Sequence, residues 1–332
     1  MAQPGDKFTK QTTAQEVVDT FGDNIKGKYV VVTGPSPGGI GYETARAIAT
    51  KEPKLLVLAA RSQSKLDQAK ADILKETPKA NVETVILDLN SLASVREAAK
   101  EISAKGQLDV LINNAAVMMT PYGKTADGFE TQFGTNYIAP WLLTNLLLPN
   151  LLKSAHPRVV FVSSMGHQFG DIRWDDIDYS KGGDYDKTNA YGQSKTATIL
   201  NAKYLAEKFG SKGLTAVALH PGAIPTNLGR HLEDGDIKAL AAFFNEDGTP
   251  NMSLGFWKNI PEGAATSVTA AFDPRWEKQN GAYLVNSQVA PLQKAGEEIP
   301  YGTENILALW ANDDKSAERL WKLTNELTKE NF

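Results

Sequence analysis

The sequence of 332 residues contains no cysteine. Disulfide bonds, zinc–thiolate sites and thiol catalysis are therefore excluded. Its four histidines are scattered without a ligand spacing such as H-E-x-x-H, so no metal site is expected. Neither positive nor negative charge is in large excess. The net charge of −4 gives no general attraction to nucleic acid or to an anionic membrane, and neither partner is expected.

Long apolar runs are missing as well. The most apolar stretch, 138–152, contains two prolines and two asparagines and is too short to span a bilayer. The N-terminus has no apolar segment of the kind found in signal peptides. These absences predict a cytoplasmic protein without a membrane span. No repeat or low-complexity linker interrupts the chain, which favours one domain.

Glycine and proline are concentrated in one turn, GPSPGGIG at 34–41. A β-branched run of strand length precedes it (28–33), and a helix is predicted after it, from about 42 to 51. Strand, glycine turn and helix in this order bring backbone N–H groups and a helix N-terminus onto a pyrophosphate. A P-loop is excluded, because Ile40 and Gly41 stand where lysine and serine or threonine are required. A plain tight turn is the alternative.

Strands and helices alternate along the rest of the chain. The pattern predicts an α/β protein with a single-domain Rossmann fold: a doubly wound parallel sheet of about seven strands with helices on both faces. Residues 1–27 are expected to form an irregular arm, 28–300 the main domain and 301–332 a helical tail that covers the domain or a partner subunit. Further strands are predicted at 54–60, 82–87, 108–112, 158–162, 214–219 and 281–285, and helices at 91–104, 129–152, 189–208, 264–272 and 315–327.

Polar residues follow the ends of these strands. Arg61 stands where an NAD site would have a carboxylate, and its guanidinium suits the 2′-phosphate of NADP; a solvated arginine is the alternative. Asp88, Asn114 and Ser164 each follow another strand. Because ligands of open α/β sheets bind outside the carboxyl ends of the strands, we expect these side chains at one edge.

Tyr191 and Lys195 are four residues apart in a predicted helix, so their side chains leave the same face one turn apart. An ammonium near a phenol lowers the pKa of the tyrosine. Such a tyrosine can exchange a proton with a substrate oxygen. A surface pair is the usual interpretation of this spacing alone, but the polar strand ends favour a catalytic one.

With these motifs, the chain resembles the short-chain dehydrogenase/reductase family. The sequence between the motifs most resembles the retinol-dehydrogenase-like and fungal carbonyl-reductase branch. The resemblance is close over 28–230 and loose over 260–290. It rests on motifs in a fixed order: Thr33 and Gly34 with Gly39, Ile40 and Gly41; Asp88 and Leu89; Asn113, Asn114 and Ala115; Asn136; Ser163 and Ser164; Tyr191 and Lys195; Pro221, Gly222 and Thr226.

The resemblance implies four catalytic residues. Tyr191 would be the general acid/base, and Lys195 would lower its pKa and bind the nicotinamide ribose. Ser164 would hydrogen-bond the substrate oxygen. Asn136 would hold a water in a proton relay to Lys195. The residues implied in binding the cofactor, NADP(H), are Gly34, Ser36, Gly39, Ile40, Gly41, Arg61, Asp88, Leu89, Asn114, Tyr191, Lys195, Pro221, Gly222, Ile224 and Thr226.

The implied reaction is hydride transfer between the pro-S face of the nicotinamide and a carbonyl or alcohol, in a homodimer or homotetramer that associates through its long helices. A catalytically idle NADP(H)-binding regulator or scaffold and a C=C reductase are kept as alternatives. Two departures from the family pattern stand out. The glycine turn is one residue longer and contains two prolines, which lack an N–H group. Ala116 stands where the family has a glycine.

The resemblance also implies that the segment 223–260 folds over the substrate, which would then be a bulky apolar aldehyde, ketone or alcohol. The alternative is that its apolar residues pack an extra helix onto the domain. His167 is expected to be a pocket-wall or structural residue, because no G-x-S-x-G elbow accompanies it. The apolar residues of the segment include Leu228, Leu232, Ile237, Leu240, Phe243, Phe244, Phe256 and Trp257.

Overall fold

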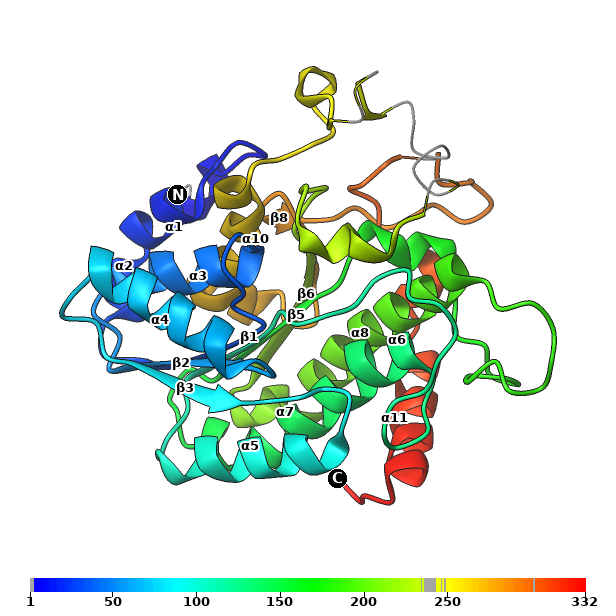
Figure 1. Ribbon diagram of the computed structural model, residues 1–332, viewed down its shortest axis with the longest axis horizontal. Coiled ribbons are helices and arrows are strands. Elements are labelled where there is room, and N and C mark those ends of the chain that lie inside the picture. Colours follow the sequence, from blue (N-terminus) through cyan, green and yellow to red (C-terminus); the bar gives the residue numbers. More distant parts are fainter. Residues whose placement is uncertain (1–2, 234, 236–242, 246, 248, 301) are drawn as a thin grey trace.

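The computed structural model describes residues 3–233, 235, 243–245, 247, 249–300 and 302–332. A single sheet runs through it in the order β3-β2-β1-β4-β5-β6-β7-β8 (Figure 1). Neighbouring strands are parallel except β7 and β8, so the predicted doubly wound parallel sheet is confirmed. The strands are β1 Tyr29–Thr33, β2 Leu55–Ala60, β3 Val82–Ile86, β4 Val110–Asn113, β5 Arg158–Val162, β6 Thr215–His220, β7 Tyr283–Val285 and β8 Gln288–Val289.

The eighth strand was not predicted. It joins β7 through a two-residue turn in which Asn286 and Ser287 have φ of 53° and 61°. Two positive φ values suit a tight hairpin, but the usual signal is Asn-Gly or Asp-Gly. A two-residue strand after a turn without glycine leaves little pattern to detect.

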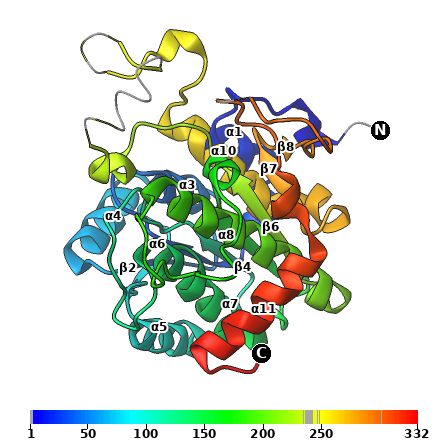
Figure 2. The same cartoon turned by 90° about the vertical axis from the view of Figure 1, so that its right-hand side faces the viewer.

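Helices cover both faces of the sheet, as predicted. In β1, Val30 and Val32 face a core shared with α1–α4 and α10, whereas Tyr29 and Val31 face a core shared with α5, α7, α8 and α11 (Figures 1 and 2). The alternation follows from the two-residue period of a strand. The helices are α1 Ala14–Thr20, α2 Gly22–Ile25, α3 Ile40–Ala49, α4 Gln63–Glu76, α5 Leu92–Ala104, α6 Thr131–Phe133, α7 Ala139–Leu151, α8 Lys187–Phe209, α10 Ile260–Phe272 and α11 Asp314–Thr328. In the described chain, no helix combines the length and apolar character needed to cross a bilayer.

The N-terminal arm lies on the domain as expected, but it is helical rather than irregular. Thr13 and Glu16 form a capping box at the start of α1: each side chain accepts from the backbone N–H of the other, at 2.7 Å for Thr13 N and 3.3 Å for Glu16 N. This box was visible as Thr-x-x-Glu before an apolar pair. Val17 and Val18 of α1 are fully buried.

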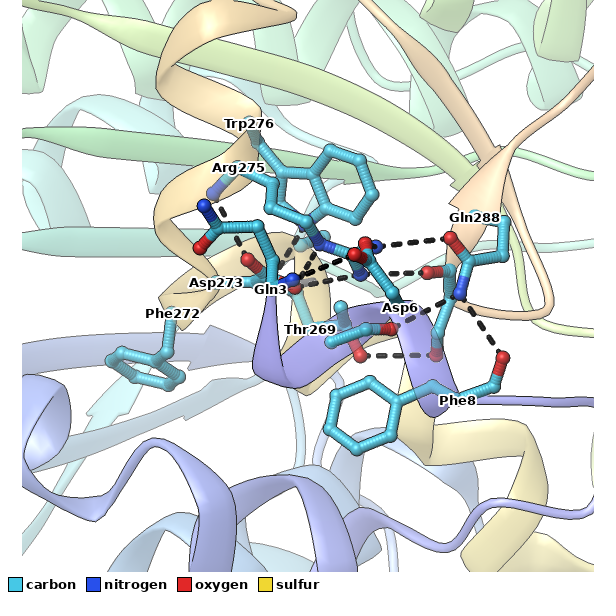
Figure 3. A network of polar contacts seen from close by, with 12 residues as sticks. Gln3, Asp6, Phe8, Thr269, Phe272, Asp273, Arg275, Trp276 and Gln288 are labelled. Atoms are coloured by element: carbon cyan, nitrogen blue, oxygen red, sulfur yellow. Dashed lines mark hydrogen bonds and ion pairs between the residues drawn. The ribbon is translucent and has the colours of Figure 1, made fainter. Parts of the chain in front are cut away.

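A polar network connects residues 5–8 of the arm to Arg275 and Gln288, next to the β7–β8 hairpin (Figure 3). Arg275 donates to Asp6 Oδ1 at 2.9 Å and to Gln288 Oε1 at 3.0 Å. Gln288 Nε2 donates to the carbonyls of Gly5 (3.1 Å) and Phe8 (3.0 Å). Arg275 and Gln288, which follow β6 in the sequence, therefore hold the segment 5–8, which precedes them by more than 260 residues.

The C-terminal helix α11 packs on α8 within the same chain (Figure 2). Trp321 lies with its ring 5.3 Å from that of Trp141 on α7 and 4.8 Å from that of Tyr204 on α8. Of the two predicted positions for the tail, the structure therefore shows the one on its own domain.

The segment predicted to cover the substrate packs partly on itself. Ala223 and Trp257 form a parallel bridge, and the rings of Phe243 and Phe256 stack at 4.1 Å. Phe244 contacts Trp257 edge-on at 5.2 Å. Ile237 and Leu240 lie outside the described residues. Its role over a substrate stays a prediction.

Candidate active site

The lengthened glycine turn is accommodated by a compact reverse turn at residues 36–39. Gly39 N donates to the carbonyl of Ser36 at 3.0 Å. Pro37 and Gly38 occupy its two central positions, and Gly38 has φ +74°, which is the pattern of a type II turn. The extra residue is therefore absorbed before α3, and Gly38 takes the left-handed conformation.

The turn passes very close to the end of β4. A Cβ on Gly34 would lie 2.8 Å from the Cα of Ala115, and one on Gly41 would lie 2.3 Å from Asn114 Nδ2. Asn114 Nδ2 in turn donates to the carbonyls of Thr33 (2.9 Å) and Gly34 (3.2 Å). Only glycine fits at these two positions, so backbone rather than side chains forms this surface.

This surface fits a diphosphate. Gly39 is the N-cap of α3, and among the described residues no side chain caps that helix end. Its first N–H groups and the positive end of the helix dipole are thus available to an anion. The glycine positions predicted to bind the cofactor are brought together here, although the two prolines contribute no N–H group.

The remaining predicted cofactor residues also lie at the carboxyl ends of the strands. Arg61 is exposed after β2, Asp88 is half-buried after β3, and Leu89 beside it is buried. After β6, a Cβ on Gly222 would lie 2.6 Å from the Lys258 side chain. Ile224 packs against Gly263 of α10, Thr226 Oγ1 accepts from Leu228 N at 3.4 Å, and Pro221 is buried at the start of the same loop.

Tyr191 and Ser164 meet as the sequence predicted. Tyr191 is 3% exposed, and the Ser164 hydroxyl lies near enough to its phenol to favour the phenolate form. The same hydroxyl accepts from Gly166 N at 3.0 Å. A Cβ on Gly166 would lie 2.6 Å from the Tyr191 ring, so this glycine lets the loop close onto the tyrosine.

Lys195 departs from the prediction in this structure. Its Nζ donates to the carbonyl of Val162 at 2.9 Å and lies 5.6 Å from the centre of the Tyr191 ring. Burial raises the pKa of Tyr191 to about 12, with the nearby Ser164 hydroxyl opposing that change, and burial lowers the pKa of Lys195 to about 7. The expected lowering of the tyrosine pKa is therefore wrong for this arrangement, because desolvation is the largest influence on that pKa.

Asn136 lies in a π-helical turn, Gly134–Ile138, between α6 and α7. Its side chain accepts from Val117 N at 2.8 Å and donates to Val117 O at 2.9 Å and to Ser194 Oγ at 3.0 Å. It thus ties the chain after β4 to α8 beside the tyrosine. Single π-turns often occur at functional sites. The predicted water relay from Asn136 to Lys195 stays a prediction.

Two residues of the site were not predicted: His220 at the end of β6 and Glu304 near the tail. Met165 N donates to His220 Nδ1 at 3.1 Å, and His220 Nε2 lies 3.6 Å from Glu304 Oε2. The position of His220 directly before Pro221 was a usable signal. Glu304 had none, because its contacts come from distant parts of the chain.

Comparisons with known proteins identify the family of this chain. A family model described as short chain dehydrogenase matches residues 28–236. Short-chain dehydrogenase/reductase prx1 of Penicillium roqueforti is 39% identical over 307 residues, covering 91% of this chain and 85% of that protein. Retinol dehydrogenase 12 of Homo sapiens is 36% identical over 304 residues (91% and 87%). A solved structure from Mycobacterium paratuberculosis superposes with a TM-score of 0.68 at 31% identity, covering 93% of this chain and 96% of the other. The chain belongs to the short-chain dehydrogenase family and is retinol-dehydrogenase-like.

Proposed function

We propose that this protein is an NADP(H)-dependent oxidoreductase that interconverts a bulky apolar carbonyl compound and its alcohol. Ser164 beside the phenol of Tyr191, with Lys195 on the next helical turn, carries the proposal. They lie at the same sheet edge as the glycine surface that fits a diphosphate. The names of curated relatives, retinol dehydrogenases, support an apolar alcohol or aldehyde as substrate.

In the proposed reaction, the bound nicotinamide supplies or accepts the hydride. Tyr191 is a neutral phenol at working pH, since its pKa is raised to about 12, and it is therefore suited to donate a proton to a carbonyl oxygen. Ser164, whose hydroxyl lies near that phenol, would hold the same oxygen. Lys195 would leave the carbonyl of Val162 to bind the ribose and steady the phenolate.

Arg61 is proposed to select NADP(H) over NAD(H). Its exposed guanidinium follows β2, and a bidentate guanidinium suits a phosphate better than a hydroxyl. Titration of the protein with NADPH and with NADH, followed by energy transfer from its six tryptophans, tests this. We expect tighter binding of NADPH, and a loss of that preference in Arg61→Gln but not in Arg96→Gln on α5. Tighter binding of NADH would remove Arg61 from the site, and binding of neither would overturn the proposed function.

The replacement Tyr191→Phe tests the proton donor. We expect turnover of any accepted carbonyl to fall by about 100-fold or more, because general acid catalysis is lost. NADPH binding should persist. Tyr204→Phe, on the same helix but against Trp321, is the matched control. Undiminished turnover in Tyr191→Phe would contradict the assignment of the acid.

A further inference from the structure

Two buried histidines hold the peptide group that joins Ser164 to Met165. The carbonyl of Ser164 lies 2.7 Å from His167 Nδ1, and the N–H of Met165 donates to His220 Nδ1 at 3.1 Å. In a trans peptide the carbonyl and the N–H point in opposite directions. The two rings therefore hydrogen-bond one peptide unit from opposite sides.

These contacts require opposite tautomers. A carbonyl only accepts, so His167 carries its proton on Nδ1, and its Nε2 accepts from Ala308 N at 3.2 Å. An N–H only donates, so His220 has a bare Nδ1 and carries its proton on Nε2, the atom 3.6 Å from Glu304 Oε2. The second nitrogen of His167 is thus held by a hydrogen bond, whereas that of His220 lies beside the Glu304 carboxylate without hydrogen-bonding it.

Ala308 and Glu304 both belong to the segment 303–310, which lies along the loop after Ser164. Gln168 Nε2 donates to the carbonyls of Thr303 (3.0 Å) and Ile306 (2.8 Å). Trp310 Nε1 donates to the carbonyl of His167 at 3.1 Å. Five side-chain contacts, two through histidine, therefore join this segment to the serine loop.

The charge on Glu304 is maintained by its neighbours. Its carboxylate contacts Lys10 of the N-terminal arm at 2.5 Å. Burial alone would raise the pKa of Glu304, but the ammonium of Lys10 lowers it, so the carboxylate is ionised. Burial lowers the pKa of both His167 and His220, which keeps the rings neutral as the two tautomers require.

We propose that His167, His220 and Glu304 are positioning residues that hold the Ser164 hydroxyl at Tyr191. Fixing the peptide after Ser164 fixes its Cα, and the serine side chain starts from that atom. The inference rests on the proposed function, in which Ser164 holds the substrate oxygen. An active-site group that is displaced by about 1 Å can lose about 100-fold in rate.

Substitutions at His220 separate a hydrogen-bonding role from simple packing. In His220→Asn, the amide oxygen takes the place of Nδ1 and can still accept from Met165, whereas His220→Leu fills the space without an acceptor. We expect kcat to fall about 100-fold in the leucine variant and less than about threefold in the asparagine variant, with the Kd for NADPH nearly unchanged in both. His156→Asn, at an exposed histidine, is the control. Equal kcat in the leucine and asparagine variants would overturn the inference.

Side-chain ¹⁵N chemical shifts test the tautomers without turnover. With four histidines in the chain, the resonances can be assigned by single replacements. At pH 7 we expect a protonated Nδ1 in His167 and a protonated Nε2 in His220, with the latter disturbed in Glu304→Gln. The same tautomer in both rings would overturn the inference. A protein that shows the two tautomers but reduces no carbonyl would refute the proposed function alone.

Discussion

At the scale of single residues, His167 links the site to stability. Its ring is fully buried, and burial lowers its pKa from 6.5 to about 4. Between these two pH values the His167 ring is protonated in the unfolded chain and neutral in the folded chain. The free energy of unfolding therefore decreases as the pH falls from 6.5 toward 4.

Urea unfolding across this range measures the effect. A difference of one pKa unit corresponds to about 1.4 kcal/mol, so His167 can account for a loss of about 3 kcal/mol. His220, whose pKa is also lowered by burial, acts in the same direction. His167→Asn should flatten the pH dependence. An unaltered slope in His167→Asn would show that the buried ring is not the group that titrates.

The sequence predicted which residues meet at the site better than it predicted their electrostatics. Spacing placed Tyr191 and Lys195 on one helical face, and strand ends placed Ser164 beside them. The direction of the change in the tyrosine pKa depends mainly on burial, and the Lys195 ammonium donates to the carbonyl of Val162. Neither is encoded in the spacing of two residues.

At the scale of elements, the glycine turn contains glycines required for two different reasons. Gly38 needs a positive φ but has space: a Cβ there would meet no described atom within 4 Å. Gly41 has an ordinary φ but no space, because Asn114 and the carbonyl of Gly34 lie against it.

Alanine at each position should therefore have a different effect. Gly38→Ala is expected to lower the free energy of unfolding by about 1–2 kcal/mol and to leave the NADPH affinity within a few-fold. Gly41→Ala forces the turn away from β4 and should weaken NADPH binding at least about tenfold, since an anion-binding backbone has to shift. Unfolding curves and cofactor titrations on both variants check this. Equal NADPH affinities would contradict the distinction.

The helical stretch predicted at 129–152 illustrates what an apolar pattern leaves out. Helix was correctly predicted, but the π-turn Gly134–Ile138 inside it was not. A π-turn changes which carbonyl each N–H contacts without removing apolar residues from the buried face. The pattern of buried residues therefore looks helical either way, although the turn decides where Asn136 points.

At the scale of the whole molecule, α11 covers a surface on α8 that the family resemblance would assign to a partner subunit. Trp321→Ala removes the ring that contacts Trp141 and Tyr204. We expect a loss of about 3–5 kcal/mol in the free energy of unfolding and increased self-association through the bared surface. Chemical unfolding and sedimentation velocity measure the two effects. Lys322→Ala, at an exposed residue of the same helix, is the control. Unchanged sedimentation of Trp321→Ala would contradict the expectation that the exposed surface of α8 self-associates.

The sheet and most helices could be predicted because they depend on local pattern. The contacts that hold distant segments of the chain together could not be predicted, because each depends on a single pair of residues far apart in the sequence. The contacts of Arg275 with Asp6 and of Glu304 with Lys10 each connect residues more than 260 positions apart. No periodicity or motif in the sequence indicates such a pair.

Lys10 and Glu304 also constrain how this sequence can diverge. Glu304 faces two lysines, Lys10 and the buried Lys258, so replacing it while both remain would remove a carboxylate that opposes their charge. Lys10 has a side chain that is 24% exposed, and its early loss would cost less. We therefore expect substitutions at Lys10 and Glu304 to be epistatic, with loss of the lysine before the carboxylate tolerated better than loss of the carboxylate alone.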